Sequence, residues 1–190
     1  MSAEFAPRRL FVAGATGATG RVVVRLAEEQ GVDVVPHLRP KSAAKGAHPK
    51  AAVCELSDAP ALEAAMRGSS TVMQLIGTMR KRFAAGDTYE SSDIATTVYL
   101  AEAARKCAVD HFILLSSVGA GSPVGAYLKA KALAEEAVVR SGVPYTILRP
   151  SSFDGGGHRP PPGTYLLTRL PGLGKYRPIA LEDLARTLLH

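Results

Sequence analysis

The chain has 190 residues, of which 46% are hydrophobic, and a formal net charge of +6. This length predicts one well-buried domain over residues 1–190 and is short for two. Because the basic residues are scattered, aromatic residues reach only 6% and Trp is absent, nucleic acid is not expected as a partner.

The two cysteines and five histidines show no metal-ligand spacing, so we expect reduced thiols at Cys54 and Cys107 and no metal site. The start, MSAEFAPRRL, lacks the pattern of a secretory signal, and no apolar run approaches a membrane span. We therefore expect a cytoplasmic protein that does not bind membranes.

Six short runs rich in Val, Ile and Leu alternate with longer segments rich in Ala, Glu, Lys and Arg, a pattern typical of alternating strands and helices. None of the runs alternates cleanly between polar and apolar residues, which indicates parallel strands buried on both faces. The expected strands span residues 9–13, 32–38, 51–55, 71–76, 111–117 and 144–148. With right-handed crossovers they predict the α/β class, as a doubly wound parallel sheet of the Rossmann type.

Three segments look like copies of one helix-to-strand joint: GVDV at 31–34, AVDH at 108–111 and GVPY at 142–145. Each places a glycine or another small residue where a helix pattern ends and a strand pattern begins. A further helix over 59–67 has a capping side chain, Asp58, directly before it.

The segment DGGGHRPPPG, residues 154–163, is the one strong break in the pattern, and its glycines and prolines predict a loop beyond the sixth strand. It is either a plain surface excursion or a loop over a ligand site. We expect a small substrate-side region at about 152–178. After it, ALEDLARTLLH predicts a final amphipathic helix that stops abruptly at His190.

The first strand runs into GATGATG, a loop whose glycines each have a physical role in dinucleotide binding. Gly14 permits a tight turn, Gly17 lets the backbone approach a pyrophosphate, and Gly20 lets the following helix pack closely. Backbone N–H groups of residues 17–20 should point outward at the helix start, where the dipole favours an anion. The expected dinucleotide contacts in this loop are Gly14, Thr16, Gly17, Ala18, Thr19 and Gly20. A tight turn without a ligand is the alternative.

The second strand ends in HLRPKSAAK, where a residue that distinguishes NAD from NADP is expected. Arg39 stands nineteen residues after Gly20, Lys41 and Ser42 follow, and no Asp or Glu occurs between 34 and 54. A guanidinium suits a 2'-phosphate, so the pattern favours NADP(H) over NAD(H). A solvated basic turn is the alternative.

GATGATG, LRP, LLSSVGAG, YLKAKALAEE and YTILRPSSF together, in this order and spacing, resemble the atypical short-chain dehydrogenase/reductase superfamily. The chain is most similar to its NAD(P)H-binding branch, which includes NmrA-like proteins and reductases of the biliverdin reductase B and flavin reductase type. The resemblance covers nearly the whole chain.

This resemblance implies further cofactor contacts at the ends of later strands. They are Glu55 and Leu56 beside the adenine, Ile76, Gly77 and Thr78 beside the nicotinamide-side ribose, Ser116, and Pro150 and Ser151 in the turn below the nicotinamide. The family usually has Asp where this chain has Glu55. Ordinary packing at strand ends is the alternative for each.

Tyr127 and Lys131 are four residues apart on a predicted helix, so their side chains share one face. The resemblance implies that Tyr127 protonates a substrate oxygen and that Ser117 polarises a substrate carbonyl. It also implies that Lys131 lowers the pKa of Tyr127 and holds the nicotinamide ribose. Ser117 precedes Tyr127 by only ten residues, which is shorter than is usual in the best-known branch of the superfamily. A complete Ser-Tyr-Lys site is therefore one of two alternatives. In the competing arrangement, bound NADPH delivers hydride without a tyrosine acid, and the protein supplies orientation and a dry pocket.

The sequence thus predicts an NADP(H)-dependent oxidoreductase that reduces a small carbonyl, quinone or flavin-like substrate. A non-enzymatic, NmrA-like NADP sensor is the main alternative, and an isomerase or dehydratase would need a larger substrate domain. RKRF at 80–83, His158 and Arg159 are either substrate contacts or solvated loop residues. The sequence has no clear signature of the oligomeric state and is compatible with a homodimer.

Overall fold

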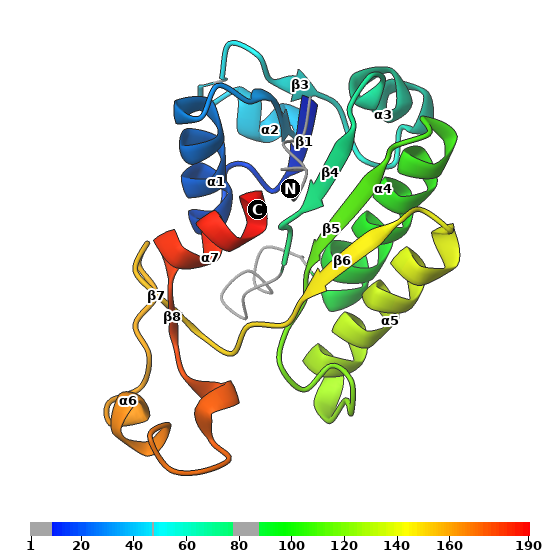
Figure 1. Cartoon of the computed structure of the whole chain (residues 1–190). Helices are drawn as coiled ribbons and strands as arrows, with labels where there is room; N and C mark the ends of the chain where they lie inside the picture. The colour runs from blue at the N-terminus through cyan, green and yellow to red at the C-terminus, as the bar shows by residue number, and fades with distance from the viewer. Residues whose placement is uncertain (1–8, 47, 78–87) are drawn as a thin grey trace, which may run out of the picture.

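The computed structural model describes residues 9–46, 48–77 and 88–190, and its centre is a six-stranded parallel sheet (Figure 1). The strands lie in the order β3-β2-β1-β4-β5-β6, and neighbouring strands pair in parallel. They are β1 (Arg9–Ala13), β2 (Asp33–Leu38), β3 (Ala52–Val53), β4 (Thr71–Gln74), β5 (His111–Leu115) and β6 (Tyr145–Leu148). The expected doubly wound α/β fold is confirmed.

Helices cover both faces of this sheet (Figure 1). One face carries α1 (Ala18–Glu29), α2 (Pro40–Ala43) and α7 (Leu181–Leu189), and the other carries α3 (Ala59–Met66), α4 (Ala95–Lys106) and α5 (Gly125–Ser141). Strand β1 is buried on both sides because its side chains alternate: Leu10 and Val12 join the core under α1 and α7, and Phe11 and Ala13 join the other.

The strand order places a ligand crevice between β1 and β4. From β1 the chain crosses outward through β2 and β3, and then returns to the opposite side of β1 as β4. Loops leaving the carboxyl ends of β1 and β4 therefore diverge, and open α/β sheets bind ligands at such a switch point.

The three helix-to-strand joints share a residue with positive φ. Gly31, Ala108 and Gly142 have φ values of +75°, +51° and +74°, and each follows the end of a helix. A positive φ is sterically strained for Ala108, whose Cβ crowds the backbone, but not for the two glycines. At the start of α3, the Asp58 carboxylate accepts the N–H of Ala61 at 3.1 Å, as expected of a cap.

Some strands are shorter than the sequence predicts. β3 is a two-residue edge strand. β4 ends at Gln74, although Leu75 N–H still donates to Ala13 O at 2.9 Å; the N–H of Ile76 then donates to the side-chain carbonyl of Gln74 at 2.6 Å. β5 ends at Leu115, but Ser116 N–H still donates to Leu148 O at 2.7 Å, so sheet-like pairing runs on past the strand.

Beyond β6 the chain forms a small projecting lobe (Figure 1). A short parallel pair of strands, β7 (Phe153–Asp154) and β8 (Ile179–Ala180), forms the base of this lobe. The helix α6 (Thr164–Leu167) comes between them in the chain. The expected loop at 154–163 therefore begins inside a strand. The expected final helix is α7, which returns to α1, where Arg25 and Glu182 form an ion pair at 2.6 Å. Among the helices of the described ranges, none has the length and apolar character needed to cross a bilayer.

Candidate dinucleotide site

The GATGATG loop packs so closely, both against the segment that follows β4 and against itself, that two of its glycines cannot carry side chains. Gly14 has a φ of +91°, and a Cβ there would lie 2.8 Å from the carbonyl carbon of Leu75. A Cβ on Gly20 would lie 2.1 Å from the carbonyl oxygen of Gly14. The first glycine therefore permits the turn, and the third permits α1 to begin directly beneath it.

The start of α1 is open to an anion. Gly17 is its N-cap and supplies no side-chain cap, and no acidic residue lies in the first turn. Gly17 N–H donates back to Gly14 O at 2.9 Å, so it closes the loop and does not point outward as expected. The N–H groups of Ala18, Thr19 and Gly20 are the ones at the helix start that a phosphate would meet.

Two cavities adjoin at this loop, and both are lined by Gly17, Leu75, Ile76 and Gly77. The first, of about 270 Å³, extends toward the end of β2. Its other lining residues are Gly14, Thr16, His37, Leu38, Arg39, Ser42, Leu56, Ser91, Ser92 and Thr96. The second, of about 180 Å³, extends toward α5. Its other lining residues are Ala18, Thr19, Gly20, Leu115, Ser116, Tyr127, Lys131, Phe153 and His158.

Most of the residues expected to bind the cofactor line one of these cavities, but five of the expected site residues do not. Those five are Lys41, Glu55, Ser117, Pro150 and Ser151. Glu55 and Lys41 are exposed, whereas the Ser151 hydroxyl donates to Arg177 O at 2.8 Å. Thr78 and the RKRF segment lie outside the described residues.

At the far end of the first cavity, Arg39 is exposed and precedes α2, which also contains Ser42. Beneath them His37 is buried, and its Nε2 lies 2.9 Å from Cys54 O. Burial lowers the pKa of His37 below its ordinary value, although the contact with Cys54 opposes the shift. The lowered pKa favours a neutral imidazole, so among the described residues that line this cavity the positive charge is carried by the Arg39 guanidinium.

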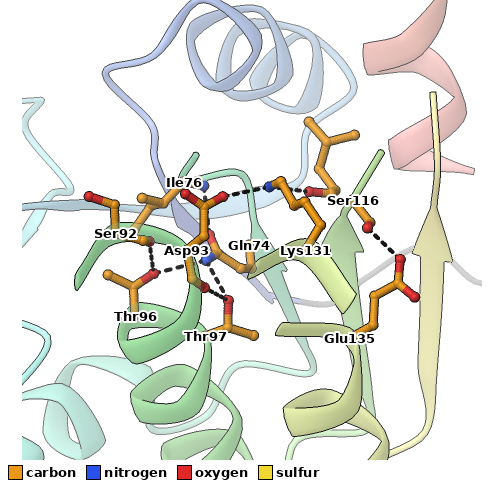
Figure 2. Close-up of polar contacts among 10 residues, drawn as sticks. Gln74, Ile76, Ser92, Asp93, Thr96, Thr97, Ser116, Lys131 and Glu135 are labelled. Carbon is orange, nitrogen blue, oxygen red and sulfur yellow. Dashed lines mark hydrogen bonds and ion pairs between the residues drawn. The ribbon is translucent and has the colours of Figure 1, made fainter. Parts of the chain in front are cut away.

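The second cavity brings Tyr127 and Lys131 together, as their spacing predicts. The ammonium of Lys131 lies 6.0 Å from the centre of the Tyr127 ring, and Tyr127 is 36% exposed. Lys131 is buried: its Nζ lies 2.9 Å from Asp93 Oδ1 and 3.3 Å from Leu115 O (Figure 2). The ring of Tyr89 lies 5.6 Å from that of Tyr127, centre to centre.

A second carboxylate, Glu135, organises the end of β5. It accepts the Ser116 hydroxyl (Figure 2) and two hydrogen bonds from Arg149, at 2.9 and 2.5 Å. Burial alone would raise the pKa of Glu135, but the bonds from Arg149 and Ser116, with the charge of Lys131, hold it below its ordinary value. Ser117 lies outside the cavity, and its hydroxyl donates to Val118 O at 3.4 Å.

The sequence reading missed Asp93, Gln74 and Glu135. A signal existed for Glu135, which follows Lys131 by four residues and so shares its helix face. Gln74 was visible as an amide inside the apolar run TVMQLI, where an uncharged polar side chain needs partners. Asp93 had no local signal, because its partner is 38 residues away on another helix.

A glycine turn that leads into an uncapped helix at a topological switch point defines the class of Rossmann-fold dinucleotide-binding proteins. The chain belongs to the NAD(P)H-binding family, whose model matches residues 14–190. The resemblance to atypical short-chain dehydrogenases/reductases is thereby confirmed at the level of an NAD(P)-binding protein.

Two curated plant proteins are similar to this chain. Protein TIC 62, chloroplastic, of Pisum sativum is 33% identical over 180 residues, which cover 80% of this chain and 33% of that protein. Divinyl chlorophyllide a 8-vinyl-reductase, chloroplastic, of Oryza sativa subsp. indica is 31% identical over 160 residues, covering 76% and 40%. The chain thus spans less than half the length of these two relatives.

Among solved structures, the Bordetella bronchiseptica enzyme WbmH in complex with NAD+ has the same fold. The TM-score is 0.70 at 16% sequence identity, and the match covers 95% of this chain and 70% of that one. At this identity the likeness supports the fold alone.

Proposed function

We propose that this protein is an NADP(H)-dependent oxidoreductase that transfers hydride to a small carbonyl, quinone or flavin-like substrate. The observation that carries the proposal is the second cavity, in which Tyr127 and Lys131 stand beside the glycine loop and the start of α1. A coenzyme bound at the glycine loop would therefore share one wall with a phenol that can donate a proton.

The coenzyme would lie along both cavities. Its pyrophosphate would meet the N–H groups of residues 18–20, and its adenosine would occupy the first cavity, lined by Leu56 and Ile76. Arg39 and Ser42 would bind the 2'-phosphate, since a guanidinium and a hydroxyl are both donors to phosphate oxygens. A 2'-phosphate held in this way would make the protein prefer NADP(H) to NAD(H).

The coenzyme would supply the hydride, and the chain would supply position and a proton. Tyr127, partly exposed at the cavity wall, would donate its phenolic proton to the substrate oxygen that gains the electron pair. Lys131 would hold the ribose next to it by hydrogen bonding.

The two serines support a site that works without a serine donor. Ser116 lines the cavity, but its hydroxyl proton is directed to Glu135, and the Ser117 hydroxyl is directed to a backbone carbonyl. Polarisation of a substrate carbonyl therefore falls to Tyr127. The name of the rice relative, a vinyl reductase, is in keeping with a reductive activity.

The direct test is NADPH consumption by the purified protein against a panel of quinones, flavins and aldehydes. We expect turnover of one of these classes, and for an aldehyde or ketone a loss of ~10²-fold or more in kcat for Tyr127→Phe with unchanged NADPH affinity. Tyr145→Phe, an exposed tyrosine on β6 outside both cavities, is the control and should match the wild type. Tight NADPH binding without turnover of any class would instead favour the sensor.

A further inference from the structure

A buried ion pair forms part of the wall of the second cavity. Lys131 Nζ and Asp93 Oδ1 are 2.9 Å apart, and the two side chains are 6% and 0% exposed. Lys131 comes from α5, whereas Asp93 comes from the π-helical turn Glu90–Ile94 (η2) that precedes α4. The pair therefore joins two separate segments at the carboxyl edge of the sheet (Figure 2).

The π-turn is held in place from the sheet by Gln74. The Gln74 amide donates to the hydroxyls of Thr96 and Thr97, at 3.2 and 3.0 Å, and these hydroxyls donate in turn to Ser92 O and Asp93 O (Figure 2). Gln74 is fully buried and its carbonyl oxygen is also used. The backbone of Asp93 is thus tied to β4, which fixes the position from which its carboxylate reaches Lys131.

The ammonium faces the cofactor cleft past Gly77. A Cβ built on Gly77 would lie 3.4 Å from Lys131 Nζ and 3.6 Å from Asp93 Oδ1, so this glycine lies against the pair without a side chain to crowd it. An ammonium has three donors. Within the described parts of the chain, Lys131 uses two, one for Asp93 and one for Leu115 O, which leaves one for a bound molecule.

We propose that Asp93 is the positioning residue for Lys131. Its carboxylate fixes the ammonium at the cavity wall and cancels its charge, so that Lys131 offers one directed hydrogen bond to a neutral hydroxyl and attracts no phosphate. The inference rests on the proposed function, because this hydroxyl would belong to the nicotinamide-side ribose of the coenzyme.

Stability alone is a poor reason for this pair. A buried ion pair costs desolvation that its attraction only partly repays, and apolar side chains of similar volume often serve the fold as well. A charged pair at the wall of a cleft, with one donor directed into the cleft, has a use that an apolar pair cannot have. An experiment can therefore distinguish the two roles: an apolar pair could restore stability but could not restore coenzyme binding.

The test uses Asp93→Asn, Lys131→Met and the double variant in the full chain, with NADPH affinity and apo-protein Tm as readouts. We expect each single variant to bind NADPH about tenfold or more weakly, and the double variant to bind no more weakly than Lys131→Met. We expect the Tm of the double variant to lie above that of either single variant, because no charge remains buried alone. Glu63→Gln, which removes the carboxylate of the surface pair with Lys106 at 2.7 Å, is the matched control and should leave affinity unchanged.

Recovery of Tm without recovery of affinity is the result that positioning requires. Wild-type affinity in Asp93→Asn, with or without a lower Tm, would overturn the proposal, and so would losses in the two single variants that add in the double. If the wild type binds neither NADPH nor NADH, the proposed function fails. The apo-protein Tm values then still decide whether Asp93 holds Lys131, since a double variant no more stable than the singles contradicts that contact.

Discussion

Gly20, in the first turn of α1, packs directly against Gly14, and no side-chain atom fits between the two residues. A Cβ on Gly20 would lie 2.1 Å from Gly14 O and 2.7 Å from Ala15 Cα. Both neighbours are backbone atoms, so the clash can be relieved only if the helix or the loop moves. This contact fixes how close the glycine loop lies to the N-terminus of α1, and the two together would bind the pyrophosphate.

Gly20→Ala should therefore reduce both folding stability and NADPH binding. We expect a loss of ~1–3 kcal/mol in the free energy of unfolding, as for other overpacked sites, and a large loss of affinity. Urea titration and coenzyme fluorescence measure the two effects. The control is Gly174→Ala, whose Cβ meets no atom within 4 Å. Unchanged stability and binding in Gly20→Ala would mean that the loop is not packed as described.

Arg39→Ala should distinguish the two coenzymes. If Arg39 binds the 2'-phosphate, the variant loses affinity for NADPH by ~10-fold or more and keeps its affinity for NADH, which has no such phosphate. Titration of the variant with each coenzyme checks this. Arg140→Ala, which removes an exposed arginine paired with Glu136 on α5, controls for net charge. An equal loss for both coenzymes, or none, contradicts the assignment.

The parts of the fold that depend on local sequence could be predicted. The glycine loop, the strand positions and the three joints are each encoded within a few neighbouring residues, and Gly31, Ala108 and Gly142 all have a positive φ. Strand ends were predicted less accurately: past the end of β4, for example, the N–H of Ile76 donates to the side chain of Gln74. No strand pattern contains that information.

Within the candidate site, residues on one element were predicted and contacts between elements were not. Tyr127 and Lys131 share a helix face, so spacing alone places them together. Asp93 reaches Lys131 only because the π-turn is tied to β4 and α4 packs beside α5. Ser116 and Ser117 are adjacent in sequence, but only Ser116 lines the cavity, and the sequence motif did not show which of the two would do so.

Gln74→Leu should destabilise the protein although the two side chains have similar volume. It would leave the half-buried hydroxyl of Thr96 and the buried hydroxyl of Thr97 without their donor, and the N–H of Ile76 without its acceptor. We expect a loss of ~1–3 kcal/mol in the free energy of unfolding, measured in urea. Met73→Leu, at the neighbouring buried position of β4, is the control and should cost less. A Gln74 variant as stable as the wild type would show that the network does not support the π-turn.

Acid should weaken the fold partly through Glu135. Its pKa in the folded protein is held below its ordinary value of 4.5, chiefly by Arg149 and Ser116 against the opposing effect of burial. As pH falls, the unfolded chain takes up this proton first, so the stabilisation is complete above the ordinary carboxyl pKa and is lost as pH falls toward the folded one. Tm measured between about pH 6 and about pH 3 should therefore fall more gently in Glu135→Gln than in the wild type. Parallel curves would contradict this role of Glu135.

The central claim is that the cleft beside the glycine loop binds a nicotinamide dinucleotide. Isothermal titration calorimetry of the folded, purified wild-type protein with NADPH and with NADH tests it most directly. The account predicts one bound coenzyme per chain, with NADPH the tighter of the two. No heat of binding from either coenzyme would contradict it.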